Sequence, residues 1–431
     1  MIKKSLLLLT LIFIITKANA TWIPLGAGLP GKVRTVAVFN GDIYAGGDFT
    51  TPGRVAKWNG VSWEAVGNGF NGAVNVLTVH NNQLYAGGAF TTSGSTSTKY
   101  IAVLSGGAWQ EVGGGLNNPV NALLSDAAGL YVGGTFVVGG TTTVGRIALF
   151  NGTTWSQVGT VPSAGYVNTV AKFNGVIYIG GTFTGYAAKL VGGAWTALTG
   201  GLNSEVLTMS VFANKLYIGG RFNSPGQYYG SYSGTGSVGT AIYSLNPNGH
   251  LHALLGTPLK IFGGGAFTSS PSAGINLPHF FSTTYVGPNN LSAEGSAFND
   301  NVNAIAYLNG KVIVGGDFTQ SGATPLSRIA ISNETIDVQE ISGQVVNKSF
   351  YPNPVTTSAT LKIETLELVQ NPSLIIVDSQ YRLVEQKTDM TRNGKEIEFR
   401  ISFNSLAAGT YFYTVIDDAG NNLLVDRFIA E

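Results

Sequence analysis

Two aspartates, Asp48 and Asp317, occupy the same variable position in two copies of a repeated Gly-Gly-x-Phe pattern. If these copies lie on neighbouring units of a closed ring, the two carboxylates can share a site. A carboxylate pair serves as acid and base at a glycosidic bond in many glycosidases, and carboxylate oxygens are ligands that Ca²⁺ prefers. The alternative is that each carboxylate caps a turn at the end of its own strand. The sequence predicts no cofactor, with calcium at this pair as the open alternative.

A second candidate site is the stretch 227–234, in which Tyr228, Tyr229 and Tyr232 are interspersed with serine, glutamine and glycine. Aromatic rings can stack on the apolar faces of sugars, while hydroxyl and amide groups supply hydrogen bonds. We therefore predict a ligand-binding surface that includes these tyrosines together with Asp48 and Asp317. The competing interpretation makes residues 228–233 an irregular strand of the repeat. No catalytic residue is assigned.

Histidine and cysteine usage limits the remaining chemistry. His250 and His252 alternate along one predicted strand and suit two positions around a metal ion, but no third ligand accompanies them, so no metal site is predicted. Cysteine is absent, which excludes disulfides, thiolate metal sites and a cysteine nucleophile. Lys+Arg 24 balance Asp+Glu 23 and form no cluster, so we expect no nucleic-acid partner.

The first twenty residues have the pattern of an export signal. Lys3 and Lys4 precede an apolar stretch at 5–15, and Ala18-Asn19-Ala20 is the small-x-small pattern of a cleavage site. The apolar stretch is shorter than the roughly 20 residues that a bilayer-spanning helix needs. We predict a signal peptide at 1–20 and no transmembrane segment in the mature chain.

Internal repetition dominates the sequence from residue 22 to residue 332. An LYxGGxF element recurs seven times, twice in weaker form, with its phenylalanines 39 to 51 residues apart. These phenylalanines are Phe49, Phe90, Phe136, Phe183, Phe222, Phe267 and Phe318.

Each copy contains three further segments of strand length. An apolar alternation such as 33–39 precedes the element, and a segment such as 54–58 follows it. Next come Asn-Gly pairs, as at Asn59-Gly60 and Asn151-Gly152, and then a tryptophan-led segment such as 63–67. Because Asn-Gly favours a two-residue hairpin turn with positive φ at both positions, we predict that turn here. Each copy is thus a four-stranded antiparallel meander.

Stacking the meanders in a ring buries their faces and protects their edges, which predicts a β-propeller. The segment 22–26 matches the fourth strand of the unit, whereas the seventh copy stops after its third strand near Ile331. We therefore predict that residues 22–26 pair with residues 327–332 and close a seven-bladed ring. Copies five and six are irregular, with Tyr243 and Tyr285 near the tryptophan position, so six or eight blades stay open.

The glycine doublets and repeat tryptophans resemble those of kelch-type propellers. The fuller pattern, LYxGGxFT followed by RIAxWNGxxWxxVGxGLN, resembles more closely the propellers of fungal cortical polarity-marker proteins, over about residues 22–332. Such families are mostly binding or scaffolding proteins. Kelch-type rings also include the copper enzyme galactose oxidase, but its cysteine-linked tyrosine cannot form in a chain without cysteine.

A different composition begins near residue 333, where the glycine doublets and repeat tryptophans end. We predict a propeller domain at 21–332, a linker at 333–346 and a small antiparallel β-sandwich at 347–431. Its expected strands are 359–363, 373–377, 396–403, 409–416 and 422–429. Alternation of apolar and polar residues at 410–415 indicates a half-buried sheet.

Two pieces of this last domain resemble a sorting signal. They are Tyr351-Pro352-Asn353-Pro354 and the later Leu-Ala-Ala-Gly-Thr-Tyr run that contains Gly409 and Tyr411. Together they resemble the type A sorting domain of the type IX secretion system, a family of Bacteroidota. The resemblance implies the type IX secretion machinery as a partner, and a secreted protein or one attached to the outer-membrane surface. Residues 428–431 depart from the basic ending common in that family. The alternative is an ordinary proline-stiffened turn.

The sequence as a whole predicts an all-β, secreted or cell-surface protein. Its expected function is the non-enzymatic binding of an extracellular glycan or protein through the propeller. The alternative is a polysaccharide-degrading glycosidase or lyase that uses carboxylates on the rim.

Overall fold

The computed structural model describes residues 22–431 except 160–164, 213–214, 241–245, 258–259, 285–290, 293–294, 334–344, 379–382, 404–405, 407 and 417–421. The predicted signal peptide, most of the predicted linker, Tyr243 and Tyr285 therefore lie outside the described residues. Strands and turns make up the described part, apart from one 3-10 turn, η1 (Pro271–Ala273), and the all-β class is confirmed. No helix in these described ranges is long and apolar enough to span a membrane.

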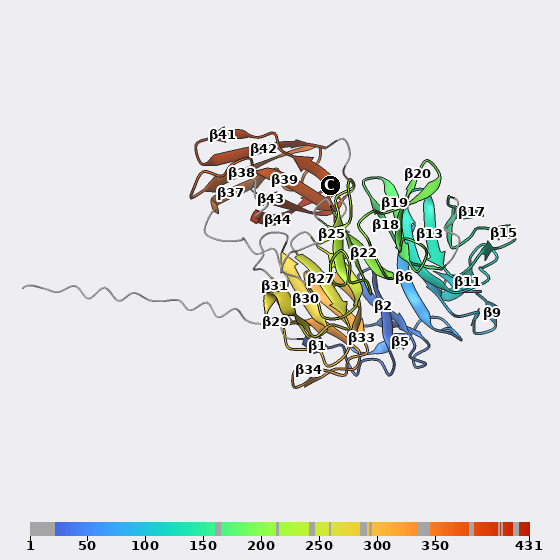
Figure 1. Cartoon of the computed structure of the whole chain (residues 1–431). Helices are drawn as coiled ribbons and strands as arrows, with labels where there is room; N and C mark the ends of the chain where they lie inside the picture. The colour runs from blue at the N-terminus through green and yellow to red at the C-terminus, as the bar shows by residue number, and fades with distance from the viewer. Residues whose placement is uncertain are drawn as a thin grey trace, which may run out of the picture.

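Seven four-stranded antiparallel sheets lie within the described residues from 22 to 332, and we name them blades 1 to 7 in chain order (Figure 1). Blade 1 consists of β2 (Val33–Phe39), β3 (Asp42–Gly47), β4 (Val55–Trp58) and β5 (Trp63–Ala65). Blade 2 consists of β6 (Val74–His80), β7 (Gln83–Gly88), β10 (Ile101–Ser105) and β11 (Ala108–Glu111). Blade 3 consists of β12 (Val120–Asp126), β13 (Gly129–Gly134), β16 (Ile147–Phe150) and β17 (Trp155–Gln157). Blade 4 consists of β18 (Val167–Phe173), β19 (Val176–Gly181), β20 (Ala187–Val191) and β21 (Ala194–Ala197). Blade 5 consists of β22 (Val206–Phe212), β23 (Lys215–Gly220), β24 (Tyr229–Tyr232) and β25 (Gly239–Thr240). Blade 6 consists of β26 (Leu251–Gly256), β27 (Lys260–Gly265), β30 (Phe280–Thr284) and β31 (Leu291–Ser292). Blade 7 consists of β32 (Val302–Leu308), β33 (Lys311–Gly316), β36 (Ile329–Ser332) and β1 (Trp22–Pro24).

The first strands of the blades contact one another in sequence. β2 packs on β6, β6 on β12, β12 on β18, β18 on β22, β22 on β26, β26 on β32, and β32 on β2 again. The first strands therefore surround the axis, and the contact between β32 and β2 joins the last blade to the first.

The N-terminal segment supplies the fourth strand of blade 7. In the pairing of β1 with β36, Trp22 lies opposite Ser332 and Pro24 opposite Ala330, which is the pairing expected from the repeat register. The Trp22 side chain is 3% exposed, and its ring centroid lies 5.2 Å from that of Phe280 and 5.0 Å from that of Phe298. This strand is therefore held by core packing as well as by backbone hydrogen bonds.

The glycine doublets allow the blades to approach closely. A Cβ atom on Gly46 would lie 2.6 Å from Cγ1 of Val74 in the next blade, and one on Gly47 would lie 2.0 Å from the carbonyl oxygen of Lys32. In blade 7, a Cβ atom on Gly315 would lie 2.4 Å from Cγ1 of Val33 in blade 1. Any side chain at these positions would push two blades or two strands apart.

Side chains of the repeat also link neighbouring blades. The indole Nε1 of Trp109 donates to the Val66 carbonyl of the preceding blade at 3.0 Å, and Trp63 donates across the ring junction to the Leu25 carbonyl at 2.9 Å. Blades 2, 3, 6 and 7 each have a short hairpin between their second and third strands. In chain order these hairpins are β8 (Thr92–Ser93) with β9 (Thr96–Ser97), β14 (Val138–Gly139) with β15 (Thr142–Thr143), β28 (Ser269–Ser270) with β29 (Ile275–Asn276), and β34 (Gln320–Ser321) with β35 (Thr324–Pro325). An asparagine before each of these blades accepts backbone N–H groups at the start of its hairpin, as Asn71 Oδ1 does at 2.8 and 3.0 Å.

The turn prediction at Asn59-Gly60 and Asn151-Gly152 is wrong. Trp58 pairs with Trp63, so the connection has four residues, and Asn59 Oδ1 accepts the N–H groups of Val61 and Ser62 at 2.9 and 2.8 Å. The asparagine side chain thus organises the turn in place of a positive φ at Asn59.

Residues 345–431 form two further four-stranded sheets, coloured brown to red in Figure 1. The first sheet contains, in the order of pairing, β37 (Val345–Tyr351), β38 (Ser358–Thr365), β42 (Glu396–Ser402) and β41 (Thr391–Asn393). The second sheet contains β40 (Leu383–Lys387), β39 (Ser373–Asp378), β43 (Gly409–Ile416) and β44 (Asn422–Ala430). One core contains Leu361 and Phe399 of the first sheet with Tyr413 and Phe428 of the second. This arrangement is the expected sandwich, but β37 begins two residues inside the predicted linker, and β40 and β41 were not expected.

We expect Gly315→Ala to destabilise the propeller by about 1–3 kcal/mol, because the new methyl group overlaps Val33 of the first blade. Urea unfolding would measure this cost, and a double-mutant cycle with Val33→Ala should recover part of it. Gly239→Ala is the control, since nothing lies within 4 Å of its Cβ position. Equal costs with and without Val33→Ala would contradict the contact between blades 7 and 1.

We expect Trp22→Ala to destabilise the protein by about 3–5 kcal/mol, because it empties a buried site in the core of blade 7. Ile23→Ala on the same strand should cost less than about 1 kcal/mol, since Ile23 is 42% exposed. Scanning calorimetry of both variants makes the comparison. Similar melting temperatures for the two would show that β1 does not hold the ring.

Candidate functional site

One end of the propeller axis is formed by three positions in every blade, and we call this end the axial rim. The positions are the residue before the first strand, the second residue of that strand, and the residue after the glycine doublet. In each blade the N–H of the last position donates to the carbonyl of the first, as from Asp48 to Lys32 at 2.9 Å and from Asp317 to Asn301 at 2.9 Å. Seven equivalent hydrogen bonds therefore fix the backbone of the rim.

Asp48 is paired with a cation of its own blade. Its two carboxylate oxygens accept from Nε and Nη2 of Arg34, each at 2.9 Å. This bidentate arrangement fixes both groups and remains partly open to solvent.

Asp317 is paired with a cation of the next blade. Its Oδ2 accepts from Nζ of Lys32 at 3.0 Å and from Nδ2 of Asn303 at 3.1 Å. Burial alone would raise the pKa of Asp317, but the hydrogen bonds from Asn303 and Lys32 outweigh it and lower this pKa below its usual value. The carboxylate is therefore ionised at neutral pH.

The two predicted aspartates thus lie on the same rim and on adjoining blades, each held by its own cation. Within the described ranges, no group of three His, Cys, Asp or Glu side chains is arranged to hold a metal ion. Because Asp317 is ionised, it cannot supply the proton that a general acid gives to a leaving group. Binding of a ligand by Asp48 and Asp317 stays a prediction.

The tyrosine prediction is corrected for Tyr229 and Tyr232. Both lie on β24 and are fully buried, so neither offers a ring face to a ligand. Tyr229 stacks on Tyr217 with centroids 5.7 Å apart, and the Tyr232 hydroxyl is 3.0 Å from Nζ of Lys189. These residues form the irregular third strand of blade 5, which was the competing interpretation.

Tyr228 lies at the residue before that strand and is half-buried. Its φ is 62°, close to the 67° of Arg54 and the 65° of Arg328 at the same repeat position. The Tyr228 carbonyl accepts the N–H of Gly220 at 3.1 Å, and its ring lies 5.3 Å from that of His250. Tyr228 therefore keeps a structural position of the repeat while facing the rim residue His250.

His250 and His252 both lie on the axial rim of blade 6, and in the described residues no two further His, Cys, Asp or Glu side chains join them. Nδ1 of His252 lies 2.9 Å from Oδ1 of Asn303 in the next blade, and burial lowers the pKa of His252. Burial also lowers the pKa of His250, with the positive charge of Arg221 acting in the same direction. Both rings are therefore neutral at pH 7, and His252 serves to join blades 6 and 7.

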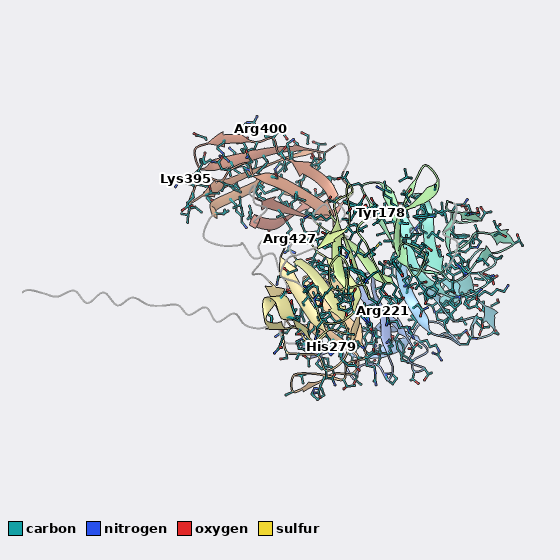
Figure 2. All side chains as sticks on the ribbon, viewed as in Figure 1. Tyr178, Arg221, His279, Lys395, Arg400 and Arg427 are labelled. Carbon is teal, nitrogen blue, oxygen red and sulfur yellow. The ribbon has the colours of Figure 1, made fainter. Side chains whose placement is uncertain are left out.

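A further cluster on the rim was not predicted. Glu205 Oε1 pairs with Nε of Arg221 at 2.7 Å, and Oε2 accepts from Nδ2 of Asn168 at 3.4 Å (Arg221 is labelled in Figure 2). Tyr166 belongs to the same rim and is 40% exposed. Aligning the repeats at the residue before the first strand would have found it, because Tyr166 and Glu205 share that position with Lys32.

The sorting segment meets the end of the chain. Oδ1 of Asn353 accepts the N–H of Ile429 at 2.9 Å, and the N–H of Val355 donates to the Ile429 carbonyl at 2.7 Å. The segment Tyr351-Pro352-Asn353-Pro354 therefore lies along the outer edge of β44.

The second half of the motif lies on the other edge of β44. Gly409 pairs with Ala430, and Tyr411 pairs with Phe428, whose ring it stacks on at 5.3 Å. The last strand is thus held between the two predicted halves of the sorting motif. Their role in sorting stays a prediction.

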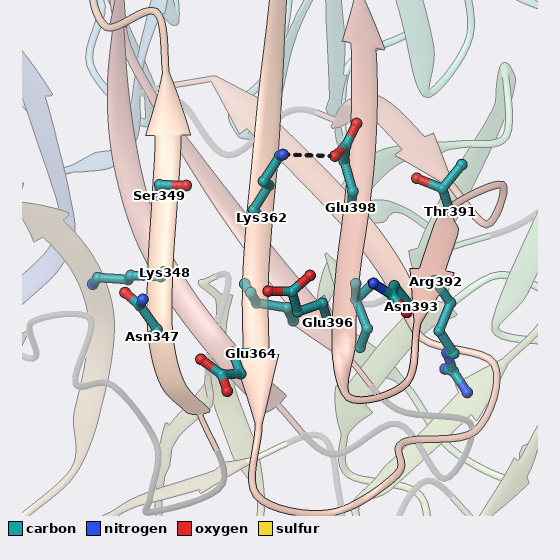
Figure 3. A pocket seen from close by; sticks show the side chains of 12 residues that line it. Asn347, Lys348, Ser349, Lys362, Glu364, Thr391, Arg392, Asn393, Glu396 and Glu398 are labelled. Atoms are coloured by element: carbon teal, nitrogen blue, oxygen red, sulfur yellow. Dashed lines mark ion pairs between the residues drawn. The ribbon is translucent and has the colours of Figure 1, made fainter.

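A shallow depression of about 260 Å³ crosses the outer face of β37, β38, β42 and β41 (Figure 3). Two of its charged groups pair with each other, Nζ of Lys362 with Oε2 of Glu398 at 3.0 Å. Hydrogen bonds from Arg400 and Lys362 lower the pKa of Glu398. Glu398 is therefore ionised at neutral pH and has no proton to donate.

Among the solved structures similar to the chain are three with low sequence identity to it. PorZ, described as an essential bacterial surface component of the type-IX secretion system of Porphyromonas gingivalis, is 14% identical with a TM-score of 0.44, and the match covers 95% of this chain and 60% of that one. The extracellular domain of a putative one-component system from B. thetaiotaomicron is 12% identical with a TM-score of 0.42, covering 95% and 59%. A fungal alcohol oxidase of the AA5 family, in complex with copper, is 12% identical with a TM-score of 0.45, covering 96% and 99%. The chain thus spans about three fifths of the length of the first two.

Two family profiles match parts of the chain, while a comparison with curated proteins finds no match. Residues 16–176 match the Rax2 C-terminal beta propeller domain, and residues 349–431 match the secretion system C-terminal sorting domain. The signal peptide, the kelch-like resemblance, the domain boundaries and a source in Bacteroidota stay predictions. The chain therefore combines a β-propeller similar to that of Rax2 with a type IX sorting domain at its end, and this sorting tail indicates a secreted or cell-surface protein.

Proposed function

We propose that this secreted or cell-surface propeller binds an extracellular glycan through its axial rim and catalyses no reaction. The observation that carries the proposal is that the rim carboxylates are already paired with cations, as Asp48 is with Arg34 and Glu205 with Arg221. Such pairs present donors and acceptors in fixed positions, which suits recognition of hydroxyl groups.

The glycan is favoured over a protein ligand by the chemistry of the rim. Its residues are mainly charged or amide side chains held by strand ends, whereas the centre of a protein interface is depleted in charged groups. The sorting tail implies that the type IX secretion machinery handles the protein. We propose in addition that the exported protein attaches to the outer-membrane surface.

The alternative of a polysaccharide-degrading enzyme rests on Asp48 and Asp317. A glycosidase needs one carboxyl group that stays protonated near neutral pH. The lowered pKa of Asp317 and the bidentate pairing of Asp48 with Arg34 argue against this assignment.

We expect Asp317→Asn to reduce stability by about 1 kcal/mol at pH 7, and to reduce it progressively less as the pH falls through the folded pKa of Asp317. The reason is that a carboxyl whose folded pKa is lowered stabilises the fold above its unfolded pKa, and this contribution is lost as the pH falls. Urea unfolding at a series of pH values measures the difference. Asp389→Asn, at an 82% exposed side chain, is the control with little effect. A pH-independent difference would show that Asp317 is not ionised in the fold.

We expect the full protein, without its predicted signal peptide, to bind at least one polysaccharide on a glycan array and to release no reducing sugar from it. The double variant Arg34→Ala with Asp48→Ala removes one rim pair without leaving a lone charge, and it should weaken binding about threefold or more. Arg400→Ala, on a 77% exposed side chain of the sorting domain, is the control. Release of reducing ends would overturn the non-enzymatic proposal, and failure to bind any glycan would overturn glycan recognition.

A further inference from the structure

We propose that the rim between blades 4 and 5 is a subsite for one neutral pyranose unit, with Tyr166 as its stacking platform and Asn168, Glu205 and Arg221 as its hydrogen-bonding groups. This inference rests on the proposed function, because it names the class of sugar and the part of the rim that holds it.

Tyr166 has the exposure and the fixed backbone that a stacking platform needs. Among the described propeller residues, it is the one aromatic side chain in the group of exposed large apolar residues. Its N–H donates to Oγ1 of Thr182 at 3.0 Å, and its carbonyl accepts the Thr182 N–H at 3.0 Å. The backbone that carries the ring is therefore set before a ligand arrives, which reduces the entropy lost on binding.

The hydrogen-bonding groups lie at adjoining rim positions. Asn168 is two residues after Tyr166 on blade 4, and its Nδ2 reaches both Glu205 at 3.4 Å and the Val206 carbonyl at 3.1 Å on blade 5. Glu205 occupies in blade 5 the position that Tyr166 occupies in blade 4. The packing of β18 on β22 holds the two positions side by side.

The charge balance selects a neutral sugar. The Arg221 side chain is 47% exposed, and its ion pair with Glu205 engages Nε at 2.7 Å. Hydroxyl groups can bond to this pair without adding charge, whereas the carboxylate of an acidic sugar would lie beside the carboxylate of Glu205 and be repelled by it. The positions equivalent to Tyr166 in the other blades are Lys32, Ala73, Pro119, Glu205, His250 and Asn301. Blade 4 is thus the blade with a tyrosine at this rim position, which supports placing the subsite beside it.

The test is calorimetric titration of the full protein, without its predicted signal peptide, with cello-, xylo-, manno- and malto-oligosaccharides as neutral probes and oligogalacturonate as the acidic probe. We expect at least one neutral probe to bind more tightly than the acidic one. Tyr166→Ala should weaken that binding about tenfold, while Tyr166→Phe keeps the stacking face and most of the affinity. The double variant Glu205→Ala with Arg221→Ala should weaken it to a similar degree.

Val191→Ala is the matched control, because Val191 is 51% exposed and lies at the end of β20, outside the rim. Thermal unfolding should be nearly unchanged in Tyr166→Ala, so that lost affinity reports lost contact. Binding that survives Tyr166→Ala, a preference for the acidic probe, or binding to array polysaccharides without binding to any neutral probe would each overturn the subsite while leaving glycan recognition in place. Absence of binding to every glycan would instead overturn the proposed function itself.

Discussion

The close contact between a glycine of one blade and a first-strand residue of the next determines this structure. At Gly46 and Gly315 a single added methyl group would meet Val74 and Val33 of the following blade. Because the contact joins blade 7 to blade 1 as well, the ring is held by packing in a chain that has no cysteine. The second glycine of each doublet lets two strands of one blade approach, and the residue after it then forms the rim hydrogen bond. The rim chemistry thus depends on residues that have no side chain.

Much of the propeller could be predicted because the repeat spacing and the apolar alternation indicate the same strands. The expected strand 33–39 has the bounds of β2. The turn at Asn59 could not be predicted in the same way, since an asparagine can satisfy a turn either through positive φ or through its side-chain oxygen. Strands β40 and β41 were missed because their sequences, rich in polar residues, lack a clear alternation.

The candidate site was predicted only in part, for a related reason. Asp48 and Asp317 were placed at one end of the ring because they share a repeat position, but their cations come from other segments, whose proximity depends on strand register. The residue type of Tyr229 and Tyr232 suggested a binding surface, whereas their place in the third strand decided that they are core. Exposure is a property of position, and here the repeat alignment was the better guide to it than aromatic composition.

The seven repeated backbone hydrogen bonds of the axial rim have a consequence for how such a protein can diversify. Since main-chain atoms of each blade hold its rim positions, lysine, tyrosine, glutamate, histidine and proline all occupy the same place without altering the scaffold. Recognition and folding are therefore separable in this architecture. Under the proposed glycan recognition, substitutions at the rim of one blade would change the sugar contacts of that blade alone, while the other six blades keep the ring intact.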